Sequence, residues 1–325
     1  MGTVADNKAY ALETKELIKQ ALIAKGAVIT DETTFREYAA IIAGFEVADN
    51  TIEDWLISDV NTPEEYANDR VTEIASYAFY AKTLGKMRFE NVKYIRAYAF
   101  AESNVSEIEL PNVTSIGEYA FRYCEDLKPM NFSNVTTIER YAFFGAGKIG
   151  DVEIPKLASL PSGAFYQCEL TRFSAPLLVN VESTAFNGCA DLIEFSATQL
   201  TSLGGSAFNA CTNLTSVNIP LVTVIANSTF QKCSALGKLD LPAVTSIEAK
   251  AFNSCSALET LILRSETVCT LGATSAFNST PIASGTGYIY VPSAIIEEYK
   301  VATNWSIYAD QFRAIEDYPD ICGGK

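Results

Sequence analysis

The stretch LTSVNIPLVTVIANSTFQKC, residues 214–233, decides the fold, because its pattern recurs along most of the chain. Written as a consensus, one unit is L-x-x-V-x-I-P-x-V-x-x-I-x-x-x-x-F-x-x-C. Ten marker phenylalanines follow one another at intervals of 21 or 22 residues, with a final interval of 25: Phe79, Phe100, Phe121, Phe143, Phe165, Phe186, Phe208, Phe230, Phe252 and Phe277. A period of this length indicates a repeat architecture, in which each unit covers the apolar side chains of its neighbour.

The apolar pattern within one unit predicts one coil of a solenoid. The segment around Val217 and Ile219 alternates apolar and polar residues, which predicts a short strand. A second apolar pair, Val222 and Ile225, precedes a polar turn and then the marker Phe230. No single unit can bury these side chains, so we expect the units to stack into a rod with parallel strands.

This pattern resembles the leucine-rich repeats of the BspA-like type, which occur in bacterial surface proteins and in some protist and phage proteins. The resemblance covers residues 71–290. The repeats of this chain lack the regular Asn of the commonest leucine-rich repeat. It implies an α/β-type repeat, a leucine-rich-repeat solenoid of about ten 21–22-residue coils with short parallel strands. Members of the family bind many different partners, so the resemblance predicts the architecture and not the ligand.

Most of the cysteines share one column of the repeat, three residues after the marker Phe: Cys124, Cys168, Cys189, Cys211, Cys233 and Cys255. Other units place Ser103 or Ala146 there, so the column favours a small buried side chain. The sequence has no C-x-x-C motif and no Cys/His cluster, which a metal site of this kind would need. Disulfides between neighbouring units are within distance reach, and a bridge between Cys269 and Cys322, which lie off the column, stays open.

The two ends differ from the repeat. We expect four segments: a helical module at 1–48, a linker that covers the first coil at 49–70, the solenoid at 71–290 and a small cap at 291–325. In the cap, residues 288–292 predict the last strand, and Ser293 is the expected N-cap of a short helix. Trp305 and Tyr308 are expected to cover the last coil.

The N-terminal segment predicts two amphipathic helices that form a hairpin. Their apolar positions are the candidate assembly residues Leu12, Leu17, Ile18, Leu22, Phe35, Tyr38, Ile41 and Ile42. The hairpin resembles a short module of phage tail-associated proteins. It serves either as a cap on the solenoid or as a docking module that joins copies of this chain or other virion proteins.

Aromatic residues flank the marker Phe in the N-terminal units only. The candidate ligand-face residues are Tyr77, Tyr80, Tyr98, Tyr119, Tyr123, Tyr141, Phe144 and Tyr166. Later units carry Gly, Ser, Thr and Lys two residues before the marker and Asn or Gln one residue after it. The aromatic stripe either stabilises the stack or forms a binding face for sugar or protein.

Composition narrows the function classes. The net charge of −15 argues against nucleic-acid partners, and no apolar run is long enough to insert into a membrane. Histidine is absent, and no catalytic, cofactor or metal-binding motif is found, so we expect neither enzyme activity nor a cofactor. The first interpretation is a phage virion component, of the tail or fibre, that recognises a host surface. The alternative is a BspA-like bacterial surface or secreted adhesin that binds a host protein or glycan.

Overall fold

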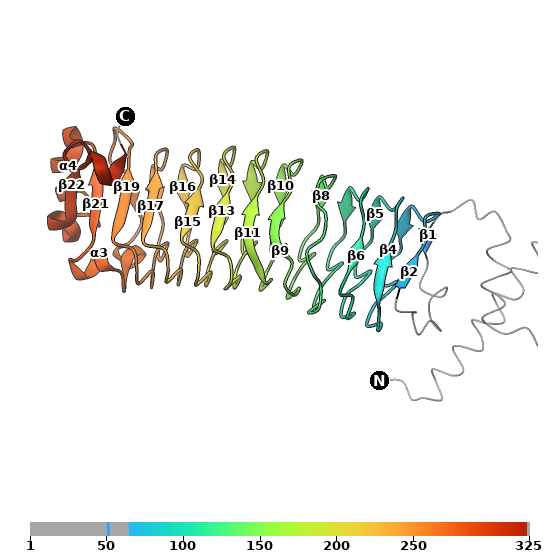
Figure 1. The fold of residues 1–325 in the computed structure, drawn as a ribbon. Coiled ribbons are helices and arrows are strands. Elements are labelled where there is room, and N and C mark those ends of the chain that lie inside the picture. The colour runs from blue at the N-terminus through green and yellow to red at the C-terminus, as the bar shows by residue number, and fades with distance from the viewer. Residues whose placement is uncertain (1–50, 53–64, 324–325) are drawn as a thin grey trace, which may run out of the picture.

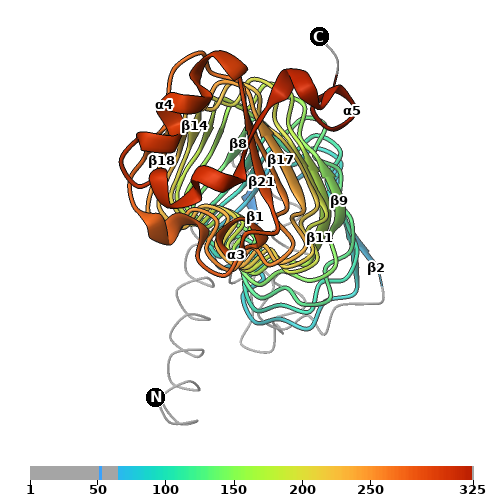
Figure 2. The same ribbon diagram turned by 90° about the vertical axis from the view of Figure 1, so that its left-hand side faces the viewer.

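The computed structural model describes residues 51–52 and 65–323. These residues form a rod of stacked turns, and the turns contribute strands to two rows that run along the rod (Figure 1). Figure 2 looks along the rod and shows the two rows on two sides of the turn, with the interior between them. The predicted solenoid is confirmed, with about eleven turns in this part of the chain.

The first row consists of two-residue strands that end on the second residue of the second apolar pair of the unit, as the strand Val224–Ile225 ends on Ile225. They are β1 (Thr51–Ile52), β3 (Glu73–Ile74), β5 (Tyr94–Ile95), β7 (Ser115–Ile116), β8 (Thr137–Ile138), β10 (Ser159–Leu160), β12 (Asn180–Val181), β14 (Ser202–Leu203), β16 (Val224–Ile225), β18 (Ser246–Ile247) and β20 (Thr270–Leu271). The pairing is parallel and keeps equivalent residues in register, so that Ile74 lies beside Ile95 and Ile95 beside Ile116.

The strands of the second row have two to five residues. They are β2 (Glu65–Ala67), β4 (Lys86–Arg88), β6 (Ile108–Glu109), β9 (Gly150–Glu153), β11 (Leu170–Ser174), β13 (Glu194–Ser196), β15 (Ser216–Asn218), β17 (Lys238–Leu241), β19 (Thr260–Leu263), β21 (Tyr288–Val291) and β22 (Phe312–Ala314). Because β1 and β2 pair with β3 and β4, the ladder already includes residues of the segment that the sequence predicts to be a linker.

The marker phenylalanines form a continuous stack inside the rod. Each of the ten rings is at most 1% exposed. Ring centroids of successive markers lie 4.8 to 5.7 Å apart, and the planes of most pairs are within 7° of parallel. The spacing of the rings therefore follows the spacing of the turns, which is the distance between neighbouring strands.

The cysteines are interior side chains, as the small-residue column predicts. All eight are free and buried. In five units the thiol of the column cysteine donates to the carbonyl of the marker Phe in the preceding unit, at 2.8 to 3.1 Å. Cys269 and Cys322 lie in separate hydrophobic clusters, so the bridge that the sequence left open between them does not form.

The C-terminal cap closes the last turn with short helices and one extra strand. Two short helices, η2 (Thr274–Phe277) and α3 (Pro281–Ser284), belong to the last repeat. The helices of the cap are η3 (Ser293–Ile295), α4 (Ile296–Val301), η4 (Ser306–Gln311), η5 (Ile315–Asp317) and α5 (Pro319–Cys322). The Trp305 ring lies 5.7 Å from that of Phe277, and its Nε1 donates to the Cys269 carbonyl at 2.6 Å. The hydroxyl of Tyr308 donates to the Thr274 carbonyl at 2.9 Å.

Two details of the predicted cap are wrong. The strand at Tyr288–Val291 is not the last one, because β22 pairs with it in parallel. Ser293 does not cap a helix through its side chain, because it lies inside η3, and α4 begins three residues later with Ile295 at its N-cap.

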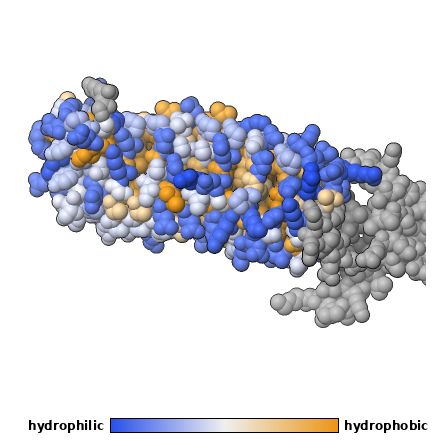
Figure 3. Space-filling model, viewed as in Figure 1, coloured by the Kyte–Doolittle hydropathy of each residue, from blue (hydrophilic) through white to orange (hydrophobic). Residues whose placement is uncertain are grey.

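On the side of the rod seen in Figure 3, hydrophilic residues predominate and hydrophobic residues show as small patches between them.

Candidate ligand-binding face

The tyrosines two residues before the marker Phe occupy a left-handed backbone position. The φ angles of Tyr77, Tyr98, Tyr119 and Tyr141 lie between 55° and 62°. The same column has left-handed φ at Thr184, Ser206, Ser228 and Lys250, which follow in the later units. The left-handed turn is therefore a property of the repeat, and it does not depend on tyrosine. It holds each of these side chains outside the Phe stack.

We call Tyr77, Tyr98, Tyr119 and Tyr141 the tyrosine ladder, because their rings stack along the rod. The centroids are 4.9, 4.9 and 5.1 Å apart, with interplanar angles of 4°, 22° and 5°. Each inner ring is half-buried between its neighbours, whereas Tyr77 at the end of the ladder is 47% exposed. Stacking therefore covers the flat faces of the rings and leaves their edges to solvent.

The ladder ends at Gly163, which occupies the tyrosine column in the next unit with a φ of +65°. A Cβ atom at this position would lie less than 3.0 Å from the Cδ1, Cε1 and Cζ atoms of Tyr141. The last ring thus occupies the space that a side chain at residue 163 would need.

A second aromatic row runs beside the ladder. Tyr80 contacts Tyr77 edge-on at 5.8 Å, and Phe144 contacts Tyr141 edge-on at 6.2 Å. Tyr123 and Tyr166 both lie against Phe144, at 4.8 and 5.1 Å between ring centroids. The structure therefore brings the eight predicted ligand-face residues together on one side of the first units.

Arg122 lies at the centre of this surface, and sequence reasoning missed it. Its guanidinium carbon is 4.8 Å from the ring centroid of Tyr123, 5.8 Å from Tyr119 and 5.9 Å from Phe144. Such distances allow cation–π attraction. Arg122 also forms an ion pair with Glu102 at 3.5 Å. The available signal was its place in the column of Phe144 and Tyr166, one residue after the marker.

Glu102 links Arg122 to the first unit. It accepts a hydrogen bond of 2.9 Å from the hydroxyl of Tyr80. This hydrogen bond, with a smaller effect of burial, raises the pKa of Tyr80. We call the eight aromatic residues together with Glu102 and Arg122 the aromatic face.

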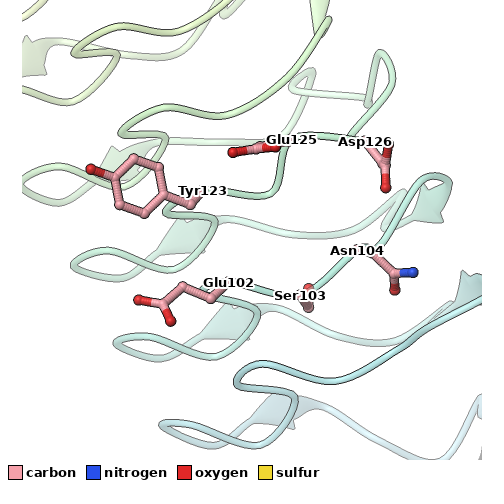
Figure 4. A pocket seen from close by; sticks show the side chains of 6 residues that line it. All are labelled: Glu102, Ser103, Asn104, Tyr123, Glu125 and Asp126. Atoms are coloured by element: carbon pink, nitrogen blue, oxygen red, sulfur yellow. The ribbon is translucent and has the colours of Figure 1, made fainter.

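Shallow grooves flank Tyr123, whose side chain is 37% exposed. One of them has a volume of about 530 Å³ and is lined by Glu102, Ser103, Asn104, Tyr123, Glu125 and Asp126. In Figure 4, Glu102 and Tyr123 lie at one end of this groove, and Asn104 and Asp126 lie at the other. Carboxylate and amide groups beside an exposed ring can hydrogen-bond polar groups of a ligand.

The C-terminal units carry an amide stripe in place of aromatic rings, at Asn187, Asn209, Gln231 and Asn253. The amide of Gln231 donates to Asn253 at 3.3 Å. The candidate assembly residues of the helical module at 1–48 lie outside the described residues, so their role stays a prediction.

The fold and the repeat identify the class of protein. The chain belongs to the BspA type leucine-rich repeat family, whose model matches residues 51–172 and 158–284. A search of curated protein sequences found no match. Among the described residues, no helix is long and apolar enough to cross a membrane, and no group of three or more Cys, Asp or Glu side chains could hold a metal ion.

Solved structures of several bacterial proteins are similar to this chain. A leucine-rich repeat protein from Bacteroides ovatus is 20% identical, with a TM-score of 0.43 over 77% of this chain and 83% of that one. A leucine-rich cell surface protein from Faecalibacterium prausnitzii is 21% identical, with a TM-score of 0.39 over 76% and 81%. The pneumococcal vaccine antigen PcpA is 15% identical, with a TM-score of 0.36 over 79% of each chain.

Proposed function

We propose that this chain is a non-enzymatic recognition protein, a bacterial surface or secreted adhesin that binds a protein or glycan through the aromatic face. The observation that carries the proposal is the tyrosine ladder, which holds large aromatic side chains at outward positions of the first units. Tyrosine and arginine are enriched among the residues that dominate binding energy at interfaces. Because stacking already fixes the rings, little side-chain entropy is lost when a partner binds.

The competing interpretation is that the ladder only stabilises the stack. Stacked aromatic pairs do contribute about 0.5–1.5 kcal/mol each. However, the same left-handed turn forms at Thr184, Ser206 and Ser228 without an aromatic ring, so the fold does not require tyrosine there. The restriction of the rings to one half of the rod favours a role in recognition.

The narrower interpretation as a phage virion component rests on the N-terminal resemblance alone. Residues 1–48 lie outside the described part of the chain, and the three solved structures reported above come from bacteria. We therefore place the adhesin first. Membership of the BspA type family agrees with this choice, because repeats of this type occur in bacterial surface proteins as well as in some phage proteins.

The test is retention of the labelled intact chain on three surfaces: a glycan array, immobilised extracellular-matrix proteins and fixed epithelial cells. The ladder variant combines Tyr98→Ser and Tyr119→Ser, which introduce the residue that the same column already has at Ser206 and Ser228. The control combines Ser206→Thr and Ser228→Thr, since Thr184 already occupies this column.

We expect the wild type and the control to be retained equally on at least one surface. Retention of the ladder variant should fall about tenfold or more, which corresponds to about 1.4 kcal/mol of binding free energy. Equal retention of the ladder variant and the control would contradict the proposal, and so would a wild type that none of the three surfaces retains.

A further inference from the structure

We infer that the partner that the aromatic face fits best is a second copy of this chain, packed against it in the antiparallel direction. The inference rests on the proposed function and names the ligand of that same face. It would make the adhesin homophilic, so that surfaces carrying the chain bind one another.

The tyrosine ladder presents mainly the edges of its rings to a partner. The interplanar angles of 4°, 22° and 5° show that each inner ring has its flat sides against other rings. A sugar ring that needs a free aromatic face finds none on the two inner rings, Tyr98 and Tyr119. What remains is a row of ring edges and phenol groups, which repeat every 4.9 to 5.1 Å along the rod.

A partner that matches this row must repeat its own groups at the same spacing. Neighbouring strands in any sheet lie about 4.7–4.9 Å apart, so a second stack of turns has this spacing along its length. A second copy has the ladder itself. Phenol hydroxyls both donate and accept hydrogen bonds, so two such rows are chemically complementary to each other.

Symmetry then defines the register. A two-fold axis perpendicular to the rod, placed between the second and third marker units, sets Tyr98 opposite Tyr119 of the other copy. The same axis sets Tyr77 opposite Tyr141. Such an isologous contact uses one surface of each copy and closes at the dimer.

Charge supports the same register. Glu102 follows the second marker, Phe100, and Arg122 follows the third marker, Phe121. Arg122 stands one residue and Glu102 two residues after its marker, so the axis brings Arg122 of each copy to the unit of the other copy that carries Glu102, and the charges complement each other twice across the contact. Within one chain Nη1 of Arg122 makes a single long contact of 3.5 Å with Glu102, and Nε is buried without a partner among the described residues, so a second carboxylate would bind through the Nη groups.

The contact spans only four units, so we expect it to be weaker than a standard interface of about 800 Å² on each partner. Weak contacts of this kind become effective when many copies are presented together, because each later contact forms at a high effective concentration.

The experiment is sedimentation velocity of the full chain over a wide concentration range, with two charge-reversal variants, Glu102→Arg and Arg122→Glu. Each variant alone places like charges opposite one another across the two-fold axis. An equimolar mixture of the two variants restores opposite charges in a mixed dimer. The matched controls are Arg172→Glu and Glu194→Arg, which reverse an exposed pair at 3.7 Å on strands β11 and β13.

We expect the wild type and both controls to self-associate alike. Each Glu102 or Arg122 variant alone should associate at least about tenfold more weakly than the wild type. The mixture of the two variants should recover most of this loss. A wild type that stays monomeric throughout overturns the inference. A mixture that associates no better than the single variants also overturns it, because the association then uses another surface.

The sedimentation experiment and the retention test can fail independently of each other. If the wild type stays monomeric while the ladder variant loses retention on one of the three surfaces, the inference falls and the proposed function stands. If the mixture restores association and no surface retains the chain, the aromatic face binds a second copy, and the proposed adhesion to a protein or glycan on those surfaces is contradicted.

Discussion

The ring of Tyr141 occupies the space above Gly163 that a side chain would need, and this relationship ends the tyrosine ladder. Earlier units have a tyrosine at the equivalent position, so each ring stacks on the next. At the fifth marker unit the glycine offers no ring, so Tyr141 stacks on Tyr119 on one side, contacts Phe144 edge-on, and lies over Gly163 on the other side. A single residue thus marks the end of the tyrosine ladder.

Replacing Gly163 by Ala should destabilise the chain by about 1–3 kcal/mol, because alanine is disfavoured at left-handed φ and its Cβ would displace the ring of Tyr141. Denaturant unfolding measures the loss. The matched control is Ser206→Ala in the same column, where φ is 56° and a side chain is already present; it should change stability by less than about 0.5 kcal/mol. Equal effects of the two substitutions would show that the ring does not depend on Gly163.

Replacing Phe208 by Ala should cost about 3–5 kcal/mol, because it empties one position of the buried stack. The Phe208 ring is fully buried and lies 5.3 Å from Phe186 and 5.4 Å from Phe230. The control is Val224→Ala, at an outward position that is 39% exposed. A loss below about 1 kcal/mol for Phe208→Ala, measured by the same unfolding method, would be inconsistent with a continuous stack.

The cysteine column should not react with thiol reagents in the folded protein. Burial raises the pKa of Cys124 and of Cys255 to about 12, so little thiolate is present at neutral pH. We expect the native chain to react with Ellman's reagent only as fast as it unfolds, and the denatured chain to react at once. Rapid modification of column cysteines in the native chain would contradict their interior placement.

A change of Cys211 should be mild. Its thiol donates to the Phe186 carbonyl at 3.1 Å, and a thiol is a weak donor. Cys211→Ala is therefore expected to cost about 1 kcal/mol in unfolding free energy. Loss of the fold or of retention on the test surfaces in this variant would show that the cysteine does more than fill space.

Alkaline pH should weaken the ladder. Burial, followed by the neighbouring tyrosines, raises the pKa of Tyr98 and of Tyr119 above 10.0 in the folded chain. The folded state holds these protons more tightly than the unfolded state, so this stabilisation is complete below pH 10 and is lost as pH rises through the folded pKa. Unfolding free energies measured below and above pH 10 should show the loss, and Tyr98→Ser should reduce it. If Tyr98→Ser loses as much unfolding free energy above pH 10 as the wild type, the loss comes from titratable groups other than Tyr98.

Much of the fold follows from periodicity. The marker phenylalanines and the apolar pair before them are predictable because one repeated turn must bury the same positions every time. The cap was harder to predict, because it occurs once. There, Pro292 and Ser293 form the start of a 3-10 turn instead of a helix cap, and β22 joins the sheet from a segment without a repeat pattern.

The candidate face was predictable in membership but not in geometry. The columns placed the tyrosines outside the Phe stack, yet nothing in the sequence showed that their rings would stack face to face or that Gly163 would end the row. Arg122 was not predicted because its aromatic neighbours come from two units, and the left-handed positions of Tyr119 and Tyr123 help to bring these rings together.

The central claim is that the aromatic face is the binding surface, and tyrosine footprinting tests it most directly. The chain would be treated with a tyrosine-modifying reagent while free and while bound to whichever of the three test surfaces retains it. Tyr318 in the cap serves as an internal control, because at 36% it is as exposed as Tyr80. Protection of Tyr77, Tyr80 and Tyr123 on binding, with Tyr318 unchanged, is the predicted result; unchanged modification of all four would contradict the claim.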